Sequence, residues 1–236
     1  MLINGDCLLI MPTLGDNCVD MVLVDLPYGQ TACSWDCEID LTEMWVQLER
    51  ICKPNANIVF FCTTKFGTKL IISNEKWFRY DLVWNKSSSN AGFQHANRMP
   101  MRRHEMIYVF GNPKGKKKTY NPQMTEGKPY RIDKGISSTN IIGKLGAVVT
   151  DNKGTRHPSS VIERNLTGEK RYHSTQKPVS LCEWLIKSYS NEGETVLDFC
   201  CGSGSTLVAA KNTGREFIGI EMDEEIFKIA EERLNI

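Results

Sequence analysis

Residues 195–206 have the pattern of a site that binds a ligand through the main chain. Val196 and Leu197 predict a buried strand, Gly202 and Gly204 predict a tight turn, and the residues that follow predict the start of a helix. Glycines let a ligand approach the backbone closely, and the first turn of a helix offers free N–H donors. The segment therefore predicts a ligand cradle, with a generic turn of an α/β protein as the alternative.

An acidic residue follows a second buried strand. Residues 20–25 form the run DMVLVD, which is apolar and β-branched between two acids and therefore predicts a strand. Residues 26–28, Leu-Pro-Tyr, come directly after it. Ligands of open α/β sheets bind at the carboxyl ends of strands, so Asp25 stands where chemistry is expected. Because Asp and Pro also favour plain turns, these residues alone leave a structural turn open.

Both segments resemble motifs of the DNA amino-methyltransferases. Asp25 to Tyr28 resembles the family's D-P-P-Y signature, with Leu26 in place of the first proline. Residues 198–206 resemble the family's cofactor loop, whose pattern is close to D-P-F-x-G-S-G-T. Here the usual proline is missing and Ser205 is an extra polar residue before the threonine. The ligand that this resemblance implies is S-adenosylmethionine.

Two further elements, and the order of all four along the chain, make the resemblance more specific. Residues 173–178, HSTQKP, resemble the H-P-T-Q-K-P element that precedes the cofactor loop, and residues 5–7 resemble the Gly-Asp-Cys that follows the first strand in many members. The catalytic motif precedes the cofactor loop, and a basic segment lies between them. This order resembles the β-class permutation, in which the insertion recognises the target sequence. The resemblance covers nearly the whole chain and is strongest to compact bacterial and phage-borne members.

The resemblance implies methylation of the N6 amine of adenine in a specific sequence of double-stranded DNA, after the base is flipped out of the duplex. The lone pair of this amine is delocalised into the ring, so the amine is a poor nucleophile. The Asp25 carboxylate and the main-chain carbonyl of Leu26 would accept hydrogen bonds from its two N–H groups and aim the lone pair at the methyl group. Pro27 completes the motif, and Tyr28 would stack on the flipped base.

The resemblance also implies contacts with the cofactor. Glu221 ends the strand after the glycine loop, where an acid commonly accepts hydrogen bonds from ribose hydroxyls, and Met222 could cover the adenine ring. Asp6 could accept from the adenine amino group, and Lys177 would line the methionine end. The full set of expected cofactor contacts is Asp6, Cys7, Asp25, Lys177, Asp198, Phe199, Cys200, Gly202, Gly204, Ser205, Thr206, Glu221 and Met222. No metal ion is expected.

The distribution of charge points to a polyanion. The net charge of the chain is +1, but residues 113–172 hold 13 basic and 5 acidic residues. A basic segment on an otherwise acidic chain favours DNA binding, and a solvated loop is the alternative. Phe93 is the candidate for a second aromatic against the flipped base. The expected contacts with the target base and the DNA are Phe93, Lys86, Arg102, Arg103, Lys116, Lys117 and Lys118.

Strands and helices alternate around these motifs. We expect strands at residues 1–4, 20–25, 57–62, 80–84, 105–110, 195–198 and 216–221. Helices are expected at residues 40–53, 66–74, 178–189 and 205–211, and after Asp223. The alternation predicts an α/β fold with a doubly wound, mostly parallel, seven-stranded Rossmann-like sheet. Residues 1–111 and 173–236 would form the methyltransferase domain, and residues 112–172 the inserted target-recognition segment.

The composition fits a globular protein of 236 residues with 41% hydrophobic and 24% charged residues. It contains no apolar run long enough to span a membrane and no signal peptide, which predicts a cytoplasmic protein without a membrane partner. The nine cysteines form no C-x-x-C motif, which favours reduced thiols over zinc or disulfides.

Other functions stay open from the sequence alone. Cytosine-N4 methylation uses the same amine chemistry, although that subfamily more often has Ser where Asp25 stands. A non-catalytic DNA-binding protein on the same scaffold is a second alternative. A dehydrogenase is disfavoured, because Leu207 replaces the third glycine of the dinucleotide motif. The resemblance is compatible with a restriction endonuclease partner and with a homodimer, and it does not give the recognition sequence.

Overall fold

The computed structural model describes residues 1–29, 38–86, 90–115, 117–139, 143–164, 170–172 and 175–235. The chain divides into two compact units, Met1–Asn121 with Ser160–Ile236 and Pro122–Ser159. The second unit lies inside the predicted insertion at residues 112–172. The flanking parts of that insertion belong to the first unit.

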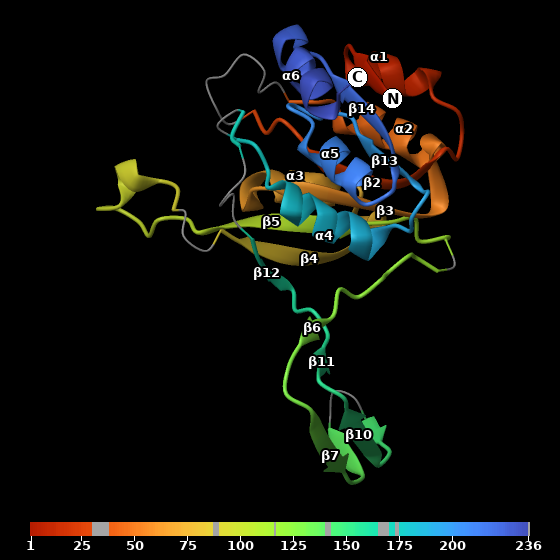
Figure 1. Ribbon diagram of the computed structural model, residues 1–236, viewed down its shortest axis with the longest axis vertical. Coiled ribbons are helices and arrows are strands. Elements are labelled where there is room, and N and C mark those ends of the chain that lie inside the picture. The colour runs from red at the N-terminus through yellow and green to blue at the C-terminus, as the bar shows by residue number, and fades with distance from the viewer. Residues whose placement is uncertain are drawn as a thin grey trace. The chain divides into compact units, whose positions relative to one another are not determined.

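A mixed sheet of eight strands forms the first unit (Figure 1). Its order is β1 (Leu2–Asn4), β14 (Glu216–Glu221), β13 (Thr195–Asp198), β2 (Val19–Asp25), β3 (Cys52–Cys62), β5 (His104–Phe110), β4 (Phe78–Asn85) and β12 (Val161–Glu163). Strand β5 is antiparallel to both of its neighbours, and the other pairs are parallel. The α/β class is therefore confirmed, but the count of seven strands is wrong. The three-residue strand β12 adds an eighth beside β4.

Six α-helices accompany this sheet. They are α1 (Cys7–Ile10), α2 (Leu41–Ile51), α3 (Thr64–Ser73), α4 (Val179–Tyr189), α5 (Ser205–Asn212) and α6 (Glu224–Leu234). Three short 3-10 helices are η1 (Met11–Thr13), η2 (Glu75–Trp77) and η3 (Phe93–His95). These bounds hold for the described residues.

Helices cover both faces of the sheet, and strand β2 shows why its sequence is apolar throughout. Val22 and Val24 belong to a core cluster with residues of α2 and α3. Met21 and Leu23 belong to a second cluster with residues of α4 and α5. Successive side chains of a strand point to opposite faces, so a strand buried on both faces needs an unbroken apolar run.

The helix starts follow from acidic capping residues. Asp40 accepts hydrogen bonds from the amides of Thr42 and Glu43 at the start of α2, and Asp223 caps α6 in the same way. Helix α2 is shorter than expected at its carboxyl end. It ends at Ile51, because Cys52 already begins β3, and Pro54 lies within that strand.

The second unit consists of antiparallel ribbons. Its strands are β6 (Thr125–Glu126), β7 (Tyr130–Lys134), β8 (Ser137–Thr139), β9 (Gly143–Leu145), β10 (Val148–Asn152) and β11 (Thr155–Arg156), paired as β6 with β11, β7 with β10 and β8 with β9. The Arg156 guanidinium lies 4.7 Å from the ring centre of Tyr130 and donates to Asn152. Periodicity did not predict these strands, because each is short, and the side chains of β6, β7, β10 and β11 are mostly exposed.

Within the described part of the chain, no helix is long and apolar enough to cross a membrane. The same residues contain no group of three His, Cys, Asp or Glu side chains placed to hold a metal ion. The described cysteines are free thiols.

Candidate active site

The glycine loop joins β13 to α5 in a conformation that only glycine adopts readily. Gly202 and Gly204 have φ angles of +52° and +79°, in the left-handed region. A Cβ atom on Gly204 would also lie 3.2 Å from the Cβ of Ala230 on α6. The loop is therefore both strained for other residues and closely packed, as expected for a turn whose main chain is offered to a ligand.

The carboxylate of Glu221 closes this loop from the neighbouring strand. Its Oε2 atom accepts a hydrogen bond from the Gly202 amide at 2.8 Å. Its Oε1 atom accepts from the Asp223 amide, also at 2.8 Å. The side chain of Asn4 donates to the Glu221 carbonyl. The ends of β1, β13 and β14 are thus held together at one residue, through its carboxylate and its main-chain carbonyl.

Asp198 is buried at the end of β13. It accepts hydrogen bonds from the Cys200 amide and from the Thr206 side chain. Burial raises the pKa of its carboxyl to about 7, and the negative charges of Asp25 and Glu221 add to the rise. This group therefore gains or loses its charge near neutral pH.

Arg233 is a part of the loop's support that the sequence did not single out. From the last turn of α6, its guanidinium donates to the carbonyl and hydroxyl of Ser203 and to the hydroxyl of Ser205. It also lies 4.5 Å from the ring centre of Tyr172, just before the HSTQKP element. One side chain thus links α6, the glycine loop and Tyr172, which precedes the segment that contains Lys177.

Asp25 lies at the carboxyl end of β2 in a network of alternating charges. Its Oδ1 atom accepts a hydrogen bond from the Tyr28 hydroxyl at 2.7 Å, and its Oδ2 atom pairs with the ammonium of Lys177. Lys177 is also 3.5 Å from Glu105 Oε2, and Glu105 Oε1 pairs with Lys86. These side chains come from the end of β2, the start of β5, the residue after β4 and the segment before α4.

The network keeps buried groups ionised. Burial alone would lower the pKa of Lys177, but the carboxylates of Asp25 and Glu105 hold it above its ordinary value. Burial alone would raise the pKa of Glu105, but the ammonium groups of Lys177 and Lys86 hold it below its ordinary value. Burial and the Asp25 charge raise the pKa of Tyr28, so its hydroxyl remains a donor.

The other residues of the predicted catalytic and cofactor sets have varied environments. The Leu26 and Phe199 side chains are buried, and Phe199 belongs to the main core cluster. Asp6 caps α1 by accepting from the Leu8 amide, and the thiols of Cys7 and Cys200 are hydrogen-bonded to each other. Met222 is exposed. Their contacts with a cofactor stay predictions, and His173 and Ser174 lie outside the described residues.

The residues predicted to contact DNA fall at two edges of the sheet. Arg102 and Arg103 precede β5, which starts at the edge where β2 and β4 end. Phe93 lies on η3 in the same connection between β4 and β5 and is 81% exposed. Lys86 is engaged with Glu105, as described above. Figure 1 shows residues 90–101 projecting from the sheet beyond β4 and β5.

The lysines after β5 lie elsewhere. Lys118 donates a hydrogen bond to the carbonyl of Pro54, near the amino end of β3. Strand β3 runs parallel to β2, so this edge is opposite to the one that carries Asp25. Lys117 is exposed, and Lys116 lies outside the described residues.

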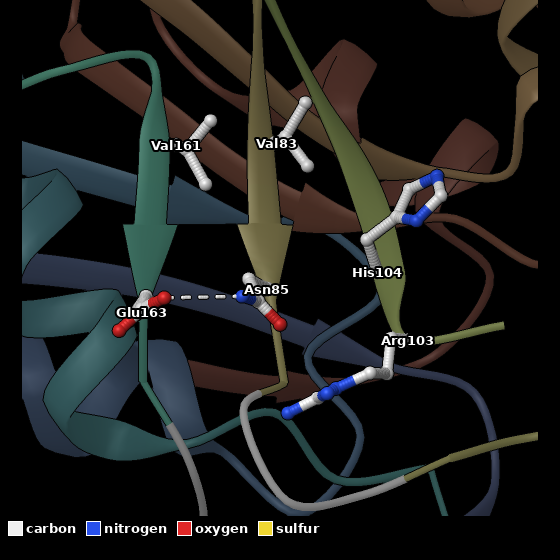
Figure 2. Close-up of a pocket in the computed structure, with 6 residues that line it drawn as sticks. All are labelled: Val83, Asn85, Arg103, His104, Val161 and Glu163. Carbon is white, nitrogen blue, oxygen red and sulfur yellow. Dashed lines mark hydrogen bonds between the residues drawn. The ribbon is translucent and has the colours of Figure 1, made fainter.

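A shallow hollow that the sequence did not predict lies at the ends of β4 and β12 (Figure 2). It is lined by Val83, Asn85, Arg103, His104, Val161 and Glu163. Asn85 donates to Glu163 Oε1 at 3.1 Å. Figure 2 shows this pair bridging the two strands, with the Arg103 side chain reaching toward the end of β4. The carboxylate of Glu163 is therefore satisfied by a neighbour outside the Asp25 network.

Solved structures resemble the whole chain. The crystal structure of the M1.HpyAVI–SAM complex has a TM-score of 0.70 and 25% sequence identity, covering 100% of this chain and 99% of that one. PvuII DNA methyltransferase, described as cytosine-N4-specific, also has a TM-score of 0.70, at 13% identity, covering 98% of this chain and 85% of that one. The second likeness shows the fold alone.

Related sequences have a similar degree of identity. The putative methylase YubD of Escherichia coli is 28% identical over 255 residues, covering 98% of this chain and 88% of its own. The type II methyltransferase M.HindIII of Haemophilus influenzae is 28% identical over 202 residues, covering 79% of this chain. This chain spans 65% of the length of M.HindIII.

The residues at the sheet edge fit S-adenosylmethionine. The left-handed glycines open the backbone at the start of α5, and the carboxylates of Asp198 and Glu221 flank that opening with acceptors for polar groups. A model of the DNA methylase family matches residues 19–232. The chain therefore belongs to the DNA methylase family of N6 and N4 methyltransferases, with S-adenosylmethionine as its cofactor.

Proposed function

We propose that this protein methylates the N6 amine of adenine in double-stranded DNA as a β-class enzyme. The observation that supports it most is the ionised network around Asp25, at the end of the strand beside the glycine loop. Strands β13 and β2 are neighbours, and the negative charge of Asp25 acts on Asp198. An acceptor for the target amine thus lies close to the cofactor loop.

The main task of the chain in this reaction is to orient the target amine. Bound S-adenosylmethionine supplies an electrophilic methyl group on its sulfonium. Asp25 and the main-chain carbonyl of Leu26 accept hydrogen bonds from the two N–H groups of the amine, which directs the nitrogen lone pair toward that methyl group. The buried Leu26 side chain fixes the carbonyl, and Lys177 forms an ion pair with Asp25.

The proposed cofactor contacts come from three strand ends. The main chain of the glycine loop would lie against the ligand, Asp198 would bind its amino acid end, and Glu221 would bind the ribose. Asp6 and Met222 hold the adenine. The geometry of Glu221 supports this assignment, because each oxygen of a carboxylate can accept more than one hydrogen bond.

The proposed DNA surface has two parts. Residues 90–104 contain three arginines and no acidic residue. They connect the end of β4 to the start of β5, at the end of the sheet where β2 ends with Asp25. Phe93 and Arg102 are exposed there, as is needed for contacts with bases and phosphates. The ribbons of residues 122–159 would read the target sequence, since two-stranded ribbons fit the major groove. A restriction endonuclease is a further proposed partner, because M.HindIII is named a type II methyltransferase.

Product analysis tests the target base. The protein is incubated with tritiated cofactor and unmethylated DNA, and the DNA is digested to nucleosides that are then separated. Label in N6-methyladenosine would support the proposal, whereas label only in N4-methylcytidine would identify the cytosine alternative. DNA binding without label would identify a non-catalytic protein. The Asp25→Ala variant, which loses the acceptor, is the matched control and should give no label.

A further inference from the structure

Both oxygens of the Asp25 carboxylate already have a donor in this structure. The Tyr28 hydroxyl donates to Oδ1, and the Lys177 ammonium pairs with Oδ2. The Lys177 side chain is only 11% exposed, so water has little access to replace it. A target amine that donates to Asp25 must therefore share this carboxylate with a buried cation, which draws electron density from the acceptor.

Glu105 offers that cation a second partner. Its Oε2 atom is buried, accepts no hydrogen bond from the described residues, and lies 3.5 Å from Lys177 Nζ. Buried carboxylate oxygens are rarely left without a donor, because the lost hydration is then not replaced. The orphaned oxygen is therefore aimed at Lys177 from a distance slightly too long for a good hydrogen bond.

The surroundings fix the carboxylate and leave the lysine free to shift. Glu105 Oε1 is held by Lys86, and Lys86 itself lies 4.9 Å from the ring centre of Trp84. The Lys177 ammonium lies 5.3 Å from the ring centre of Phe61, which gives it an apolar wall. Lysine has a long flexible stem and a point charge, so a small displacement moves the ammonium between two acceptors.

We infer that Glu105 is a positioning residue that draws Lys177 away from Asp25 when the target amine arrives. The inference rests on the proposed role of Asp25 in the reaction. In the free protein Lys177 pairs with Asp25. When the amine donates to Asp25, the ammonium closes the 3.5 Å gap to Glu105 Oε2 and satisfies it. The exchange keeps the ammonium between two carboxylates throughout, so no unpaired buried charge appears.

The test is a double-mutant cycle on Glu105 and Lys177. Glu105→Gln keeps the shape of the side chain but removes its charge, so Lys177 should stay on Asp25. We expect kcat for methyl transfer to DNA to fall by roughly tenfold or more, the size of a coupled pair in contact. The calorimetric Kd for S-adenosylmethionine and the Tm should change little. Adding Lys177→Met removes the competing cation, so the double variant should be several-fold more active than Glu105→Gln alone.

A matched substitution separates this role from general damage. Glu163→Gln makes the same change on β12, where the carboxylate pairs with Asn85 instead of a cation (Figure 2). It should leave kcat, cofactor affinity and Tm near their original values. A Glu105→Gln protein that loses cofactor affinity and Tm in parallel with kcat would show a merely structural role and overturn the inference.

Three other outcomes would also test the inference or the proposed function. Unchanged kcat in Glu105→Gln, or a double variant no better than this single variant, would overturn the inference while the original protein still methylates DNA. Absence of any label in DNA with the original protein would instead overturn the proposed function on which the inference rests.

Discussion

The Glu221 carboxylate accepts a hydrogen bond from the Gly202 amide at 2.8 Å and so ties the end of β14 to the glycine loop after β13. Its second oxygen binds the Asp223 amide, next to the start of α6. One side chain therefore fixes the loop in its left-handed conformation and still has lone pairs for a hydroxyl donor. The loop geometry and the proposed ribose contact depend on the same group.

Replacement of Glu221 should weaken cofactor binding. In Glu221→Ala the Gly202 amide and the ribose hydroxyls both lose a charged partner. We expect the loss in binding free energy to be about 1–3 kcal/mol, the usual range for such groups. Calorimetric titration with S-adenosylmethionine measures it. Glu216→Ala, at the exposed start of the same strand, is the control, and an unchanged Kd in Glu221→Ala would place the ribose contact elsewhere.

The raised pKa of Asp198 predicts how stability depends on pH. Its carboxyl ionises at about 7 in the folded protein, against an ordinary value of 3.8. Between these pH values the folded state binds the proton that the unfolded state has lost. The contribution of this group to the free energy of unfolding is therefore full below pH 3.8, falls as the pH rises, and is lost above about pH 7.

Asp198→Asn isolates this contribution, because the amide has nearly the same shape and no titration. We expect the variant to gain stability relative to the original protein as the pH rises from 4 to 7.5, measured by denaturant unfolding at each pH. A difference that stays constant across this range would show that Asp198 titrates normally. Cofactor affinity should fall in the same variant, because the charge at the amino acid end is lost.

Arg233 should stabilise the glycine loop through the fork of its guanidinium. Arg233→Lys keeps the charge but cannot maintain the hydrogen bonds to Ser203 and Ser205 together with the contact on Tyr172. We expect the free energy of unfolding to fall by about 1–3 kcal/mol and cofactor affinity to decrease with it. Lys228→Ala on the same helix breaks only an exposed pair and should change the free energy of unfolding far less than Arg233→Lys does. Equal effects of the two variants would contradict the role of Arg233.

The fold follows from the sequence wherever an element is long and buried on both faces. Strand β2 shows an unbroken apolar run, and Asp40 and Asp223 mark helix starts through capping. Strand β12 could not be found in this way. It has three residues, only Ile162 of them is buried, and its register with β4 is set by a neighbour far away in the sequence. Short exposed ribbons such as β7 with β10 lack a periodic signal for the same reason.

The residues of the site also divide into those that the sequence predicts and those that it does not. Asp25 and the glycine loop are recognisable because their chemistry is encoded in contiguous residues. Glu105 and Arg233 are not, because each acts through partners brought to it by the sheet. Lys177 was expected at the cofactor, and its pairing with Asp25 across 152 positions emerges only when the ends of β2 and the start of α4 meet. Buried charge pairs of this kind leave no local pattern in the sequence.

The two groups of basic residues predicted to bind DNA should behave differently. Arg102 and Arg103 lie at the end of the sheet that carries Asp25. Lys117 precedes Lys118, which binds the Pro54 carbonyl at the opposite end. DNA whose flipped base reaches Asp25 must pass over the first edge. We therefore expect the double variant Arg102→Ala with Arg103→Ala to bind all DNA sequences more weakly. Each lost phosphate contact should flatten the slope of log K against log salt by about 0.9.

Lys117→Ala is the matched comparison, since it removes one exposed positive charge at the opposite edge. Its salt slope should equal that of the original protein, because long-range attraction is screened beyond about 10 Å at 0.1 M salt. Fluorescence anisotropy with one labelled duplex at several salt concentrations gives both slopes. A lower slope for Lys117→Ala with none for the arginine variant would place the DNA path over the opposite edge. That result would separate the DNA from Asp25 and so contradict the proposed role of this residue.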